Sequence, residues 1–204
     1  MGEEKVNWDE VSKNPGLTES LIRNFKDKVD WNLISRYQKL SEKFILEFKD
    51  RVNWQNISAY QKLSEKFITD NENLLEWDII SKYQRLSEKF ILMHDHKVHW
   101  PAISEYQTLS DQFILENVGK LDMTLVSRYQ NMSEKTIEKL DKSVDWNEIF
   151  KYQDDLTSGF VIKQIEKITD CRVMMKLRLS DEEFNKVYKR LKLWYRTREC
   201  LNKT

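Results

Sequence analysis

The stretch Trp31-Asn-Leu-Ile-Ser-Arg-Tyr-Gln-Lys-Leu-Ser-Glu-Lys-Phe-Ile45 decides the fold of this chain, because close copies of it recur every 23 residues. The first positions of the seven copies are Trp8, Trp31, Trp54, Trp77, Trp100, Met123 and Trp146. A regular period of this length predicts stacked copies of one small unit. Each unit buries its apolar face against its neighbours, so the copies are stable only together.

Each copy carries the signals of two capped helices. Apolar side chains follow Trp31 at Ile34 and Tyr37, and a spacing of three to four residues is helical. Asp30 precedes the first helix and Ser41 precedes the second, and both are residue types whose side-chain oxygens accept first-turn amide hydrogens. We therefore predict two helices of about eight to ten residues in each repeat.

These patterns predict an all-α protein, an α/α solenoid in which short helical hairpins stack into a superhelix. We expect a single repeat domain over residues 1–204, with units that start near residues 6, 29, 52, 75, 98, 121 and 144. The pattern continues in weaker form over residues 168–201, where Ser180 and Glu183 match a capping box. We interpret this segment as a degenerate eighth unit that caps the stack, since terminal repeats of solenoids differ from internal ones.

The stretch from Trp31 to Ile45 resembles short repeats found in uncharacterised proteins of large DNA viruses and phages. The resemblance covers roughly residues 6–162. It implies a virus- or phage-encoded helical array that acts inside a host cell, and it implies no particular activity. The C-terminal segment departs from the pattern, with Asp170 where tryptophan is expected, so the resemblance does not extend to it.

Composition narrows the setting. The chain has 34 basic and 34 acidic residues, but basic residues outnumber acidic ones over residues 163–204. Its two cysteines, Cys171 and Cys200, lie far apart, which favours a reducing compartment over a disulfide framework. No apolar run approaches the roughly 18 residues that a membrane span needs. We expect a cytoplasmic protein without a cofactor, in the host-cell cytoplasm if the viral resemblance holds.

Three polar positions of the repeat recur almost without change. The serine of the first helix, as in Ser35, is interpreted as a small residue that lets helices approach closely. The Tyr-Gln pair has two interpretations, either a ladder that binds peptides or bases or a structural tie between units, and its recurrence favours the tie. The pairs begin at Tyr37, Tyr60, Tyr83, Tyr106, Tyr129 and Tyr152.

Basic residues predict a positive ridge over the second to fourth units. Stacking would align Arg36 and Lys82 with lysines and arginines near the corner between the two helices, although Glu42, Glu65 and Glu88 beside them would partly neutralise the ridge. The ridge has two interpretations: a solvated charged edge that keeps the array soluble, which is favoured, or a track that binds a phosphate backbone together with the basic C-terminal helix. The candidates for contact with phosphate or an acidic partner are Lys39, Lys43, Lys62, Lys66, Arg85, Lys89, Lys189, Arg190 and Arg196.

All three histidines, His94, His96 and His99, lie within six residues. A metal site needs ligands that converge on one point. Because His99 occupies an N-cap position and the other two lie at a corner between helices, we interpret the group as a surface cluster and predict no metal site.

The sequence favours a non-enzymatic scaffold that binds another protein through an extended surface. No Gly-rich phosphate loop and no nucleophile beside a base is present. The alternative is a nucleic-acid-binding module that uses the basic ridge and the C-terminal helix. Self-association stays open. Specificity is expected at positions that vary between repeats, namely Asn32, Arg36, Gln55, Asn56, Asp78, Lys82 and Glu105.

Overall fold

A computed structural model of the chain describes residues 6–168, 180–183 and 185–189. Throughout these residues the regular structure is helical, and none of them lies in a strand. The chain divides into two compact parts, which we call unit 1 (residues 1–107) and unit 2 (residues 108–204). Each of these units contains several of the 23-residue repeats. The predicted all-α fold with a 23-residue helical repeat is confirmed.

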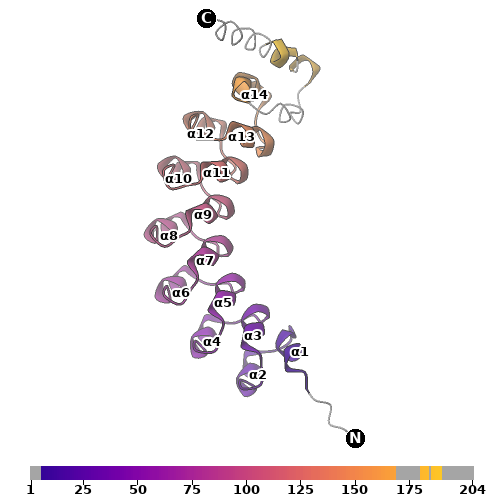
Figure 1. Ribbon diagram of the computed structural model, residues 1–204, viewed down its shortest axis with the longest axis vertical. Helices are drawn as coiled ribbons and strands as arrows, with labels where there is room; N and C mark the ends of the chain where they lie inside the picture. Colours follow the sequence, from indigo (N-terminus) through magenta and orange to yellow (C-terminus); the bar gives the residue numbers. More distant parts are fainter. Residues whose placement is uncertain (1–5, 169–179, 184, 190–204) are drawn as a thin grey trace, which may run out of the picture. The chain divides into compact units, whose positions relative to one another are not determined.

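Unit 1 consists of helices arranged in two rows (Figure 1). The odd-numbered helices pack against one another in chain order, and the even-numbered helices form the second row. Their bounds are α1 Trp8–Lys13, α2 Glu19–Asn24, α3 Trp31–Tyr37, α4 Glu42–Glu47, α5 Trp54–Tyr60, α6 Glu65–Asp70, α7 Trp77–Tyr83, α8 Glu88–Met93 and α9 Trp100–Tyr106.

Unit 2 repeats the same hairpin. Helix α11 packs against α13, and a short 3-10 helix follows α14. The bounds are α10 Asp111–Glu116, α11 Met123–Tyr129, α12 Glu134–Lys139, α13 Trp146–Tyr152, α14 Ser158–Gln164 and η1 Ile165–Lys167.

The helices begin where the capping residues predicted. The Asp30 carboxylate accepts the Leu33 amide hydrogen of α3 at 2.9 Å, and the Ser41 hydroxyl accepts that of Phe44 in α4 at 3.2 Å. The helices are shorter than predicted, however: most have six or seven residues. Helix α3 ends at Tyr37, and the next residue, Gln38, has an extended backbone and a side chain that is bonded to the preceding repeat.

The core is a column of isoleucines. Most repeats contribute one fully buried isoleucine from each helix, such as Ile34 in α3 and Ile45 in α4. In α3, α5, α7 and α13 the tryptophan that begins the helix packs against the phenylalanine of the second helix, with ring centroids 6.3 Å apart for Trp31 and Phe44. The Trp31 indole N–H donates to the Lys26 carbonyl at 2.9 Å, which ties the turn before the helix to its first residue.

The predicted C-terminal capping unit, residues 168–201, lies largely outside the described residues, and so do Asp170, Cys171 and Cys200. Within the described part, the capping box is confirmed: the Ser180 amide donates to the Glu183 carboxylate at 2.8 Å, and the Ser180 hydroxyl accepts the Glu183 amide hydrogen at 3.3 Å.

None of the helices in the described part of the chain is both long enough and apolar enough to cross a membrane.

Candidate functional site

The recurring glutamine is a structural tie, as the sequence favoured. Gln84 is 6% exposed and makes three hydrogen bonds to the preceding repeat. Its side-chain NH₂ donates to the carbonyls of Ser58 and Gln61, both at 2.8 Å, and its carbonyl oxygen accepts the Leu63 amide hydrogen at 3.1 Å. Gln61 and Gln107 repeat this pattern. The backbone groups left free by the corner are thereby satisfied.

The recurring serine bonds successive repeats, a role that its small size did not indicate. The Ser35 hydroxyl donates to the Trp31 carbonyl one turn earlier at 2.7 Å and accepts the amide hydrogen of Asn53, the N-cap of the next repeat, at 2.9 Å. In α13 the position holds Phe150, which is buried. The sequence held one signal of this role: serine occupies the position in the first six copies and is replaced only in the seventh.

The recurring first-turn acid of the second helix also belongs to this framework. The Glu42 carboxylate accepts the amide hydrogen of Ser64 in the next repeat at 2.6 Å, and Glu65 does the same for Ser87. The sequence predicted that these acids suit the dipole of their own helix and partly neutralise the basic ridge, but it did not predict a bond to the next repeat. Their hydrogen bonds place each carboxylate at the N-terminus of the neighbouring helix, where the helix dipole favours negative charge.

The recurring tyrosine alone among these positions turns outward. Between 42% and 57% of each tyrosine that ends a first helix is exposed from Tyr37 onward. We define the tyrosine edge of unit 1 as Tyr37, Tyr60, Tyr83 and Tyr106 with the flanking cations Arg36, Lys39, Lys62, Lys82 and Arg85. The tyrosine edge of unit 2 comprises Tyr129 and Tyr152 with Arg128, Asn131, Lys151, Asp154 and Asp155.

In unit 1, cations stack on the tyrosine rings at alternate repeats. The Arg36 guanidinium lies 5.3 Å from the ring centroid of Tyr37 and 5.0 Å from that of Tyr60. Lys82 bridges the next pair of rings in the same way, at 5.1 and 4.7 Å. Contacts of this length are cation–π interactions. The intervening repeat has Ala59 at the equivalent position, so its tyrosine receives no cation from its own helix.

In unit 2, Arg128 and Lys151 both stack on tyrosine rings, and Arg128 is neutralised. Arg128 lies over both Tyr129 and Tyr152 and also pairs with the Glu148 carboxylate. The hydrogen bond from Arg128 lowers the pKa of Glu148, and the same bond raises the pKa of Arg128. Arg128 lies in the repeat before Glu148, and in unit 1 Arg36 lies in the repeat before Asn56. Asn56 holds the position of Glu148, so the repeat that follows Arg36 offers an amide side chain there instead of a carboxylate.

The variable positions chosen as partner contacts have different environments. Asn32 bonds to the next repeat: its side-chain oxygen accepts from the Asn53 amide group at 2.9 Å, and its carbonyl accepts from Asn56 at 3.1 Å. Gln55 and Asp78 are exposed, and Glu105 is half-buried at the end of the unit 1 edge. Only Arg36 and Lys82 of this set belong to the tyrosine edge.

The residues of the predicted basic ridge lie in different places in the structure. Lys39, Lys62 and Arg85 are exposed beside the tyrosines. Lys43 and Lys66 line a hollow with apolar Leu46 and Phe67, and Lys66 pairs with Asp70 at 2.7 Å. Lys89 and Lys189 are exposed. Arg190 and Arg196 lie outside the described residues.

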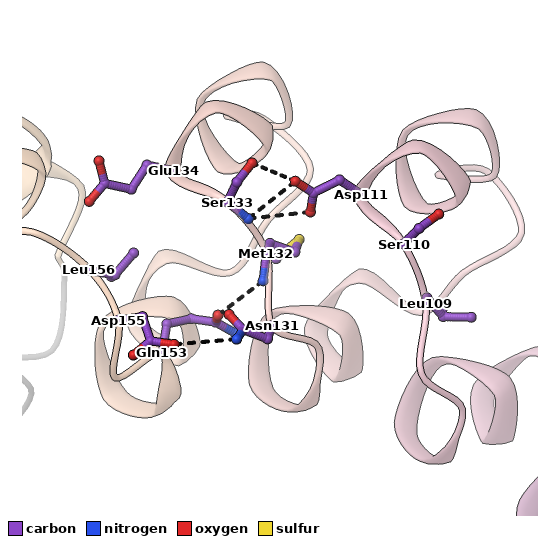
Figure 2. A pocket seen from close by; sticks show the side chains of 10 residues that line it. All are labelled: Leu109, Ser110, Asp111, Asn131, Met132, Ser133, Glu134, Gln153, Asp155 and Leu156. Atoms are coloured by element: carbon purple, nitrogen blue, oxygen red, sulfur yellow. Dashed lines mark hydrogen bonds between the residues drawn. The ribbon is translucent and has the colours of Figure 1, made fainter.

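Unit 2 has a hollow at the corners between its first and second helices, and carboxylates line it (Figure 2). Asp111 accepts hydrogen bonds from the Ser133 amide and hydroxyl, and Asp155 accepts from the Asn131 side chain at 3.4 Å. The Glu134 carboxylate accepts the Thr157 amide hydrogen at 2.6 Å. These acids are occupied as helix and corner ties, and the hollow is a by-product of the same framework.

The three histidines have separate environments. His94 is buried between Trp77 and Phe90, with ring centroids 5.1 and 4.4 Å away, and burial lowers its pKa. His96 is exposed, and His99 caps α9 as predicted, accepting the amide hydrogen of Ala102 at 3.4 Å. Within the described residues, no group of three or more His, Cys, Asp or Glu side chains is placed to hold a metal ion.

Comparison of the chain with models of protein families, with curated protein sequences and with solved structures gave no match. The regular 23-residue helical repeat is therefore established by the structure itself, and the resemblance to viral and phage repeats remains a prediction.

Proposed function

We propose that this protein is a non-enzymatic scaffold that binds another protein through its tyrosine edges. One observation carries the proposal. Among the recurring side chains of the repeat, serine, glutamine and the first-turn acid are bonded within the stack, and isoleucine is buried, whereas tyrosine is about half exposed. A side chain that recurs in successive repeats and yet remains half exposed is a candidate for contact with a partner.

Tyrosine is suited to protein recognition. It offers a large rigid ring at low entropic cost together with a hydroxyl that forms hydrogen bonds, and it is enriched in protein interfaces. The hydrogen-bonded framework holds the rings at a fixed interval, so little order is lost when a partner binds.

Nucleic-acid binding is the second candidate, because the tyrosine edge of unit 1 combines rings with five cations. The tyrosine recurs in unit 2 beside Asn131, Asp154 and Asp155, which carry no positive charge. A phosphate backbone needs cations along its track. Because the residues that follow the recurring ring are not basic in every repeat, the pattern favours a protein partner over a phosphate backbone.

The resemblance to viral and phage repeats extends the proposal. On that basis we infer that the partner is a host macromolecule in the host-cell cytoplasm, and that binding inhibits a host factor. Neither the origin nor the location enters the argument for the tyrosine edge, which rests on the geometry of the repeat alone.

Photo-cross-linking tests the proposal directly. The photoreactive residue p-benzoylphenylalanine is placed at Tyr60 or, as a matched control, at Asp50, an exposed residue in the turn between α4 and α5. Both proteins are irradiated in extract of the native cells. We expect discrete protein adducts from position 60 that survive nuclease treatment, and none of these adducts from position 50.

Adducts at position 60 that nuclease destroys would replace the proposal with nucleic-acid binding. Identical adducts from both positions would show that the tyrosine edge has no special role.

A further inference from the structure

The tyrosine edge of unit 1 carries a row of exposed basic side chains. Lys39, Lys62 and Arg85 occupy the same position in three successive repeats, two residues after the tyrosine, and all three are exposed. The nearby Glu42 and Glu65 carboxylates are bonded to the helix N-termini of the next repeats. The edge is therefore suited to an acidic partner.

The tyrosines and basic residues of this edge also recur at a regular spacing, once in each repeat. Helices α3, α5 and α7 pack directly against one another, and packed helices lie about 8–10 Å apart. Equivalent tyrosines and cations are therefore presented about every 8–10 Å along unit 1. A linear ligand whose contacts repeat at this interval can engage each repeat in turn.

A polyproline-II helix has that interval. It has three residues per turn and rises about 3.1 Å per residue, so every third side chain faces the same way about 9.3 Å farther along. A β-strand fits less well, because residues three apart in a strand point to opposite faces. Aromatic-lined surfaces are also the usual docking sites of polyproline-II segments, whose prolines pack against the rings.

We propose that the tyrosine edge of unit 1 binds a polyproline-II segment that carries an acidic side chain at every third residue. The prolines pack on Tyr37, Tyr60 and Tyr83, and the carboxylates pair with Lys39, Lys62 and Arg85. The inference rests on the proposed function and specifies its partner. Glu105, beside Tyr106, ends the basic stretch and limits the segment to about three turns.

The test uses the full chain and a fluorescein-labelled peptide of four Pro-Pro-Glu triplets, with fluorescence anisotropy as the measurement. We expect saturable binding that is weakened about tenfold by the double variant Lys62→Ala with Arg85→Ala. The matched control is Lys26→Ala with Lys49→Ala, which removes the same charge from exposed residues in the turns that follow α2 and α4 and leaves the affinity within about twofold. Circular dichroism melting confirms that both variants are folded.

Two further arms define the ligand. A peptide of four Pro-Pro-Gln triplets should bind at least about tenfold more weakly, because it lacks the carboxylates. Equal binding of that peptide, or tighter binding of a single-stranded oligothymidine than of Pro-Pro-Glu, overturns the inference. Binding that the Lys62→Ala, Arg85→Ala variant leaves unchanged does so as well.

The outcome is separable from that of the proposed function. If Pro-Pro-Glu does not bind while position 60 still cross-links to proteins, the scaffold function stands and this choice of partner is wrong. If neither is observed, both fall.

Discussion

The two tyrosine edges are built on one framework and carry different chemistry. In both units a glutamine follows the tyrosine and bonds back to the preceding repeat. In unit 1 the residue after that glutamine is Lys39, Lys62 or Arg85, whereas in unit 2 it is Asn131 and then the pair Asp154 and Asp155. Cations stack on the rings in both units, but in unit 2 the Glu148 carboxylate neutralises one of them, Arg128.

This difference separates two tasks of the repeat. The buried polar positions are held constant because each must satisfy backbone groups of a neighbour, and their replacement costs stability in any repeat. The positions beside the tyrosine face solvent, so their charge is free to vary without disturbing the stack. The same scaffold can thus present a basic edge in one unit and a mixed edge in the other.

The largest expected effect comes from breaking the shared framework. Gln84→Ala removes three hydrogen bonds and leaves buried backbone groups of Leu63, Ser58 and Gln61 unpaired, so the free energy of unfolding should fall by about 3 kcal/mol. Gln153→Ala in unit 2 should cost less, because Gln153 is half-buried and its bond to the Met132 amide is 3.4 Å long. Urea unfolding measures both.

Exposed Gln55→Ala serves as the control for this pair and should change the unfolding free energy by less than about 0.5 kcal/mol. A loss no larger for Gln84→Ala than for Gln55→Ala would contradict the assignment of the glutamine as the main tie between repeats.

Transferring the neutralising acid of unit 2 into unit 1 should weaken ligand binding. Asn56 occupies the position of Glu148, so Asn56→Glu places a carboxylate near Arg36. We expect the affinity for the Pro-Pro-Glu peptide to fall about fivefold, since the edge loses net positive charge. Asn56→Gln has nearly the same shape without the charge and should have little effect; equal losses for the two variants would point to packing as the cause.

Adding the missing cation should have a smaller effect of opposite sign. Arg36, Ala59 and Lys82 occupy the same position in three successive repeats, directly before the tyrosine, and Ala59 carries no charge. Ala59→Arg should stack on Tyr60 and raise the affinity for the Pro-Pro-Glu peptide about threefold, whereas Ala59→Gln should not. Reduced affinity of the arginine variant would mean that the ligand itself occupies the space beside Ala59.

The smallest expected effect is a pH dependence confined to unit 1. Burial lowers the pKa of His94 from its ordinary value of about 6.5. Glu72, with an oxygen 4.0 Å from Nδ1, opposes this shift, as does Glu65, whereas Lys97 and His96 add to it. Because the unfolded chain binds the proton first, stability should fall as pH drops below about 6.5 and level off below the lowered pKa.

The variant His94→Phe should remove this component, because phenylalanine occupies the equivalent position as Phe48 and packs on its tryptophan there, with ring centroids 4.8 Å apart. Melting temperatures of both proteins between pH 8 and pH 5 provide the comparison. Parallel curves would show that His94 does not titrate with the folded-state pKa described.

Much of the fold could be predicted from the chain, and the reasons are local. Asp30 and Ser41 marked the starts of helices because capping depends on a side chain and amides only three residues away. The ends were misplaced, because the first helix stops where its glutamine turns to bond with a neighbouring repeat. The bridging roles of Ser35 and Glu42 were missed for the same reason: their partners are about 20 residues distant.

The candidate site shows the same division. The sequence placed Lys39, Lys62 and Arg85 at equivalent positions of successive repeats, but it treated Tyr37 and Gln38 as one pair with one role. By itself the sequence determined the repeat, the capped starts of its helices and the isoleucine core, since these depend on period and on near neighbours. Only the tertiary structure decided that glutamine faces the interior and tyrosine the solvent, because the stacking of one repeat on the next determines which backbone groups need a partner and which faces remain in water.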